Sequence, residues 1–262
     1  MRKGSQSSTG RLVGIMVLIV VAGVLLARSY YGKLNRSVDP RITHARELYE
    51  RYDRIAPTGD YYRINALLDS ISVQYSGISH YAESFELGVV HNNRAAILLT
   101  IALHEDSIPG NLNPYADWSS DSMVSCAEYH VRKAIAIYNA WNNRFHGKEA
   151  PEIRQLIRSE FMKGLNASDP EQGDKYLNNR VKEIVSSLTE NQRRLSVCYT
   201  NLGLVYRLRG EYTEAVAQYE KAIDLWDRNL EAENNLNRIL GRPLKKRNII
   251  QKLFPPSKEL SN

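Results

Sequence analysis

The 36 residues from Asp174 to Arg209 contain no proline and a single glycine, Gly203. Apolar side chains recur along this stretch at alternating steps of three and four residues, from Val181 to Val205, which is the spacing of one helix face. A segment that keeps this period without a helix breaker predicts a single helix of about 54 Å. We expect its apolar stripe to pack on neighbouring helices of the chain rather than in a separate dimeric coiled coil. The other segments show no strand-type alternation, so the sequence predicts an all-α fold.

Sixteen uncharged residues lie between Arg11 and Arg28. As a helix they cover about 24 Å of a bilayer core that is about 30 Å thick, and Tyr30 and Tyr31 can seat the far end at the interface. We therefore predict an N-terminal transmembrane helix that anchors the chain in a lipid bilayer through residues 12–31. A cleaved signal peptide is the alternative, although Arg28 directly after the apolar run suits a cleavage site poorly. Positive charges flank both ends and fix the orientation only weakly; we favour a bacterial inner membrane with the C-terminal domain in the periplasm.

Prolines, glycines and polar clusters divide the rest of the chain. Asp39 and Asp60 are predicted to cap the first two helices, and Glu149 precedes a later one. The predicted divisions are a polar flank at 1–11, the anchor at 12–31, a linker at 32–38, degenerate repeat-like helices at 39–145 with an inserted loop at 105–121, a connecting helix and turn at 146–173, a segment at 174–247 with the long helix of 174–209, a helix pair and a capping helix, and a tail at 248–262.

Small and aromatic residues recur at fixed intervals between residues 196 and 229. Those expected to pack two antiparallel helices together are Tyr199, Leu202, Gly203, Tyr206, Ala215, Tyr219 and Ala222. Gly210 ends the first helix of the pair. These spacings resemble the tetratricopeptide repeat, a 34-residue pattern of two antiparallel helices, and depart from it at Asp227, where the family prefers proline. The resemblance implies a helical-repeat domain of stacked helix pairs, with a capping helix between Asn235 and Leu240.

Two weaker copies of the repeat are predicted upstream, because repeats of this type need stacked neighbours. Residues 126–141 align with 214–229, which puts Ala127, Val131 and Ala134 in the places of Ala215, Tyr219 and Ala222, with a first helix at 92–99. Closer to the amino terminus, Ala45, Tyr49, Tyr52 and Pro57 keep the spacing of a second helix.

In this family the first helices line a concave surface that binds peptides or partner helices. By resemblance, the residues that face this groove are Val197, Thr200, Asn201, Leu204, Arg207, Asn235 and Arg238. The asparagines are suited to hydrogen-bond a peptide backbone and the arginines to pair with carboxylates; a solvated helix surface is the alternative for the same residues.

The resemblance implies a membrane-anchored scaffold or adaptor that mediates protein–protein interactions in an envelope-associated complex, of the secretion, envelope-assembly or flagellar-motor type. The alternative is a binding module that receives a ligand or a polypeptide as a chaperone or substrate-delivery subunit. A homo-oligomer stays open.

An enzyme is not expected. The six histidines have no metal-ligand spacing, and no P-loop, dinucleotide-binding or serine-hydrolase motif occurs, so we predict no catalytic residue, no metal and no cofactor. The net charge of +6 is scattered along the chain without an aromatic and basic motif, which argues against a nucleic-acid partner. Cys126 and Cys198 are the only cysteines; we favour two buried thiols, and a disulfide in an oxidising compartment stays open.

Overall fold

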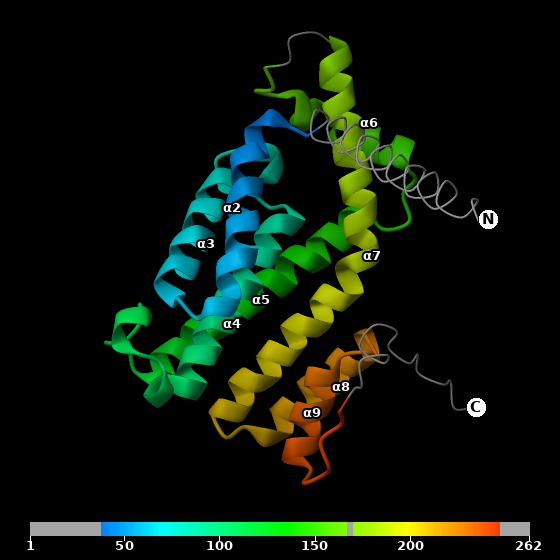
Figure 1. The fold of residues 1–262 in the computed structure, drawn as a ribbon. Coiled ribbons are helices and arrows are strands. Elements are labelled where there is room, and N and C mark those ends of the chain that lie inside the picture. The colour runs from blue at the N-terminus through cyan, green and yellow to red at the C-terminus, as the bar shows by residue number, and fades with distance from the viewer. Residues whose placement is uncertain (1–37, 167–169, 247–262) are drawn as a thin grey trace, which may run out of the picture.

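The structure is a computed structural model that describes residues 38–166 and 170–246 (Figure 1). These residues contain helices and no strand, which confirms the all-α prediction for this part of the chain. The α-helices are α2 (Thr43–Ile55), α3 (Tyr61–Ser76), α4 (Phe85–His104), α5 (Ser120–Phe145), α6 (Ala150–Met162), α7 (Pro170–Leu208), α8 (Tyr212–Leu225) and α9 (Leu230–Ile239). Short 3₁₀ helices are η1 (Pro40–Ile42), η2 (Ala56–Thr58), η3 (Ser79–Tyr81), η4 (Glu105–Ser107) and η5 (Gly110–Leu112).

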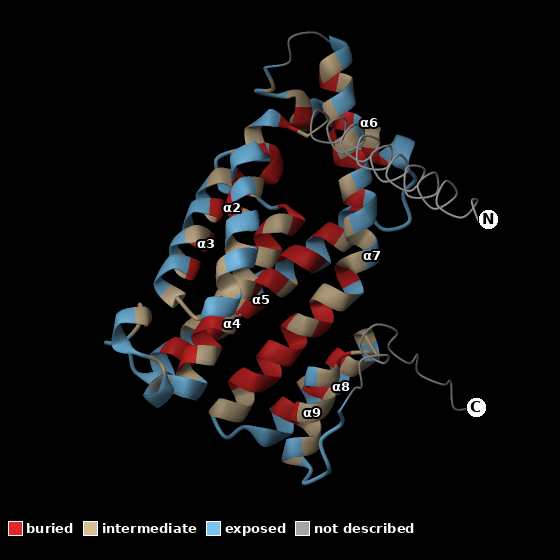
Figure 2. Ribbon diagram, viewed as in Figure 1, coloured by how far each residue is buried: buried red, intermediate tan, exposed pale blue. Residues whose placement is uncertain are grey.

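The long helix α7 joins all parts of the fold. It has 39 residues, and its ends lie close to those that the sequence predicts. In Figure 1 it crosses the molecule diagonally. Its amino-terminal half packs on α6, and its carboxy-terminal half lies between α4 and α5 on one side and α8 and α9 on the other. Buried residues follow this half closely in Figure 2. The apolar stripe is thus covered by helices of the same chain, as expected.

Side-chain hydrogen bonds cap the amino-terminal ends of several helices. The carboxylate of Asp60 accepts from the backbone N–H of Arg63 at 3.1 Å, and Glu149 and Glu152 form a reciprocal capping box at the start of α6. The predicted loop at 105–121 contains η4 and η5 and ends slightly earlier than expected. The reason is Ser119, whose hydroxyl oxygen accepts from the N–H of Ser122 at 3.2 Å and caps α5.

The predicted transmembrane helix at 12–31 lies outside the described residues, as do the polar flank, nearly all of the linker and the tail at 248–262. Among the helices of residues 38–166 and 170–246, none combines the length and the apolar character that crossing a membrane requires.

The same kind of close contact occurs in two helix pairs. In the pair of α7 and α8, a Cβ atom added to Gly203 would lie 2.6 Å from Cε1 of Tyr219. In the pair of α4 and α5, a Cβ atom added to Gly88 would lie 2.6 Å from the same atom of Tyr138. Both tyrosines are fully buried, so each pair brings its helix backbones together at a glycine that faces an aromatic ring.

The contact of Gly88 with Tyr138 shows that the repeat copy predicted at residues 126–141 has the wrong register. Tyr138, not Val131, takes the place of Tyr219, so the alignment of 126–141 with 214–229 is wrong by seven residues. The predicted first helix at 92–99 does belong to α4, which packs on α5. Relative to the Gly203 pair, α4 and α5 each carry 11 more residues, about three turns, beyond the glycine contact. Equal lengthening keeps the two antiparallel helices paired up to the loop.

The copy predicted at Ala45 to Pro57 coincides with α2. In the described part of the chain, α2 packs on α3, and α3 packs in turn on α4. A first helix that preceded α2 would fall within residues 1–37, outside the description.

Candidate functional site

The predicted groove residues lie on the first helices α7 and α9; α7 packs on α4, and α9 packs on α7. Asn201 on α7 donates its amide to Oδ1 of Asn92 on α4 at 2.9 Å. Asn235 on α9, 34 residues further on, accepts from Nη1 of Arg207 on α7 at 3.2 Å. Because Asn92 follows Gly88 by four residues, as Arg207 follows Gly203, the two contacts occupy equivalent positions. The same side-chain junction is therefore repeated between successive first helices.

Four of the predicted groove residues are largely enclosed by the chain itself. Thr200, Asn201 and Leu204 are buried, and Val197 is partly buried. The hydroxyl of Thr200 accepts from Asn229 at 2.8 Å and donates to the carbonyl oxygen of Ser196 at 2.9 Å. These side chains therefore hold the stack together, and their role in binding a partner stays a prediction.

Of Arg207, Asn235 and Arg238, which we call the arginine junction, Arg238 is exposed, Arg207 is partly buried and Asn235 is buried. Nη1 of Arg238 also donates to Oδ1 of Asn235, at 2.8 Å, so both guanidinium groups meet on one amide oxygen. Among the described residues, neither arginine forms an ion pair with a carboxylate. Arg207, Arg238, Tyr212 and Ile239 line one depression, and Arg238 and Asn235 border a second one with Glu231.

The residues that the sequence assigns to repeat packing lie on α7 and α8, which pack on each other. Tyr199 and Leu202 are buried, and Ala215, Tyr219 and Ala222 are fully buried. Tyr206 is partly buried, and its hydroxyl oxygen accepts from Arg132 on α5 at 2.9 Å. Asn229, which the sequence analysis did not single out, donates to Ser196 and Thr200 and caps α9 through the N–H of Ala232.

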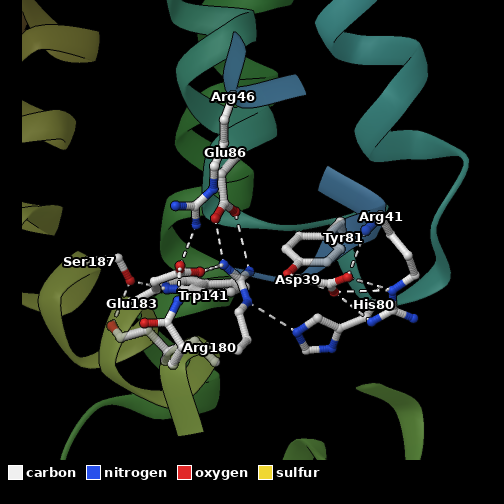
Figure 3. A network of polar contacts seen from close by, with 12 residues as sticks. Asp39, Arg41, Arg46, His80, Tyr81, Glu86, Trp141, Arg180, Glu183 and Ser187 are labelled. Atoms are coloured by element: carbon white, nitrogen blue, oxygen red, sulfur yellow. Dashed lines mark hydrogen bonds and ion pairs between the residues drawn. The ribbon is translucent and has the colours of Figure 1, made fainter. Parts of the chain in front are cut away.

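Figure 3 shows a second polar cluster, centred on Arg180 of α7. The guanidinium is 1% exposed, and its Nη1 and Nη2 donate to the two carboxylate oxygens of Glu86 on α4 at 2.5 and 3.3 Å. It also lies over the rings of Tyr81 and Trp141, 4.4 and 5.5 Å from their centroids. Glu183, one turn further along α7, pairs with Arg180 and also with Arg46 of α2.

The charges of this cluster compensate one another. Burial alone would raise the pKa of Glu86, but the adjacent guanidinium of Arg180 outweighs burial and lowers this pKa to about 2. Burial and the same guanidinium lower the pKa of His80 to about 3, so its neutral ring accepts from Nε of Arg180 at 3.2 Å. Since the hydrogen-bond partners of Arg180 come from α4, α7 and η3, the cluster fixes these elements to one another, and the guanidinium group of Arg180 is enclosed.

His91 and His130 form a third polar contact, between α4 and α5. Their Nδ1 atoms lie 2.8 Å apart, so one ring donates a hydrogen bond to the other. Burial, more than the nearby cations, lowers the pKa of both rings to about 4. No group of three histidine, cysteine or acidic side chains within residues 38–166 and 170–246 is arranged to hold a metal ion. Cys126 and Cys198 are free thiols, the first partly buried and the second buried.

The geometry is that of a helical-repeat protein: antiparallel helix pairs are stacked, and the same side-chain junction recurs between successive first helices. Residues 195–234, which cover the end of α7, all of α8 and half of α9, match the family model of the tetratricopeptide repeat. Tetratricopeptide repeats bind other proteins or peptides, and the match therefore suggests a protein–protein interaction module in this segment. No curated protein and no solved structure matches the chain significantly.

Proposed function

We propose that the protein is a membrane-anchored scaffold that docks an anionic segment of another protein on the arginine junction, within an envelope-associated complex. The repeat match supports the interaction role, and the uncharged run at residues 12–27 supports the anchor. The observation that carries the docking site is the meeting of Arg207 and Arg238 on one oxygen of Asn235.

Two guanidinium groups that share one neutral acceptor repel each other, and a carboxylate between them would relieve this repulsion. Tyr219 lies close to both arginines; its hydroxyl is fully buried and has no hydrogen-bond partner among the described residues. Its pKa is raised to about 12 by burial, against the opposing effect of Arg207, so the hydroxyl keeps its proton. Tyr212, 58% exposed on the rim, offers an aromatic surface to the residue beside the carboxylate. We therefore expect an acidic stretch or a chain carboxy terminus as the docked group.

Charge reversal tests the docking site. The double variant Arg207→Glu and Arg238→Glu is compared with Arg51→Glu, a matched reversal at an exposed arginine of α2. In native membranes, crosslinking and mass spectrometry should recover one fixed partner through an acidic segment with the unmodified chain and with the Arg51 variant. We expect the double variant to lose about tenfold or more of this product while its helical circular dichroism is unchanged. Equal recovery from all three chains would refute the docking site.

Membrane attachment and orientation need a separate measurement. Protease added to sealed cells should leave the C-terminal domain intact, and protease added after the outer membrane is opened should digest it. Digestion only after the inner membrane is lysed would place the domain on the cytoplasmic side. Recovery of the chain in the soluble fraction would refute the anchor.

A further inference from the structure

A groove lies between α3, α4 and α5, and it shares no residue with the arginine junction. Its volume is about 330 Å³. Leu87 of α4 and Ile137 of α5 line it with buried apolar side chains. Besides Lys133 of α5, the other lining residues on α3 and α5 are small and four residues apart: Ser72 and Ser76, and Ala136 and Ala140. Small side chains at consecutive turns of two helices let a third backbone approach closely.

The helix α3, which borders the groove, carries few charges for a surface helix. Helix α3 has only two charged residues, Arg63 and Asp69, and each already forms an ion pair within the chain. Val73, which follows the lining residue Ser72 in the sequence, is 69% exposed, and Tyr62 on the same helix is 51% exposed. A single exposed apolar side chain is ordinary, whereas two on a helix with few charges, beside a groove with buried apolar residues, favour an interaction surface.

The two ends of the groove carry opposite charges. Lys133 lies near His91 and helps to lower the pKa of that ring, which burial lowers most. Glu83 lies eight residues before His91 on the chain. Among the residues that the structure describes, neither Lys133 nor Glu83 forms an ion pair. The groove is thus basic at one end and acidic at the other.

We infer that this groove binds a short amphipathic helix of a partner protein, oriented with its amino terminus at Glu83 and an acidic last turn at Lys133. The helix dipole favours this direction, because its positive end meets the carboxylate and its negative end meets the ammonium group. Apolar side chains of the bound helix pack on Leu87 and Ile137, between the small residues of α3 and α5. This second contact surface does not depend on the docking of an anionic segment at the arginine junction.

Binding of a designed peptide to the full-length chain tests the inference. The probe is a fluorescent alanine-based helix of about four turns, with leucines four residues apart and two glutamates in its last turn. A companion probe has two lysines in place of the glutamates. By fluorescence anisotropy, we expect the acidic probe to bind about tenfold more tightly than the basic one. Lys133→Glu should reverse this preference.

A groove-filling variant gives the matched control. Ala136→Trp should abolish binding of the acidic probe, and Ala217→Trp, at an exposed alanine of α8, should leave it unchanged. A photoreactive phenylalanine analogue in place of Val73 should crosslink the acidic probe. Equal affinity for the two probes, or binding that survives Ala136→Trp, would overturn the inference. A crosslink from position 73 to residues 12–27 or to a second copy of the chain that the acidic probe does not displace would overturn it as well, since the groove would then hold a different occupant.

Discussion

Replacing Glu86 by glutamine tests whether the Arg180 cluster stabilises the packing of α4 on α7. The folded protein lowers the pKa of Glu86 from 4.5 to about 2, which corresponds to roughly 3 kcal/mol of stability at neutral pH. The side chain is 23% exposed, so solvent screens part of this energy. Loss of one partner of a buried ion pair typically costs about 3–5 kcal/mol, because the other charge stays buried without compensation. We therefore expect Glu86→Gln to destabilise the fold by about 2–4 kcal/mol at pH 7.

The pH dependence follows from the direction of the pKa change. The contribution of Glu86 is present above its ordinary pKa of 4.5 and is lost as the pH falls toward its folded value of about 2. Urea unfolding followed by circular dichroism should show a lower midpoint for Glu86→Gln at pH 7 with an unchanged slope, and a smaller difference from the unmodified chain at pH 3. The control Glu190→Gln removes an exposed ion pair with Arg193 and should cost less than about 1 kcal/mol. The reasoning would be refuted if Glu86→Gln cost less than about 1 kcal/mol at pH 7. It would also be refuted if the stability difference between this variant and the unmodified chain were as large at pH 3 as at pH 7.

Further predictions concern the glycine contacts and the cysteines. Gly88→Ala and Gly203→Ala should each lower the free energy of unfolding in a thermal melt by about 1–3 kcal/mol, because the new methyl group meets a fully buried tyrosine. The control Gly110→Ala places its methyl group in open space and should be nearly neutral in the same experiment. If the two helical variants melt at or above the temperature of the unmodified chain, the close approach of the backbones is wrong. Burial raises the pKa of both thiols, most strongly that of Cys198. Iodoacetamide at pH 7 should therefore label Cys126 slowly and Cys198 only after unfolding. Rapid labelling of Cys198 in the native protein would contradict its burial.

Local sequence patterns predicted the elements whose signals lie within one helix or one turn. The length of α7 follows from the absence of prolines between residues 174 and 208 and from its three- and four-residue period. The repeat at 196–229 was recognisable because its glycine and tyrosine, Gly203 and Tyr219, are separated by one short turn. In that case the spacing along the chain and the contact in space are set by the same few residues.

The equivalent contact of Gly88 with Tyr138 was missed, although Leu87 and Gly88 repeat the pair Leu202 and Gly203. Longer helices and a longer loop separate its two residues, so the family spacing no longer holds. The seven-residue shift was invisible from sequence because it preserves a helical face: two turns of helix return small and apolar residues to nearly the same side.

What the sequence determined by itself is the set of helices and the face that each one buries, because propensity, capping and periodicity act over a few residues. Only the tertiary structure decided which faces meet: Asn201 with Asn92, Arg207 with Asn235, and Arg180 with Glu86, which are 109, 28 and 94 residues apart. The physical reason is that a polar side chain on a helix is equally compatible with solvent and with a buried partner. Its role is fixed only when another helix removes the water and supplies the matching hydrogen bond or charge.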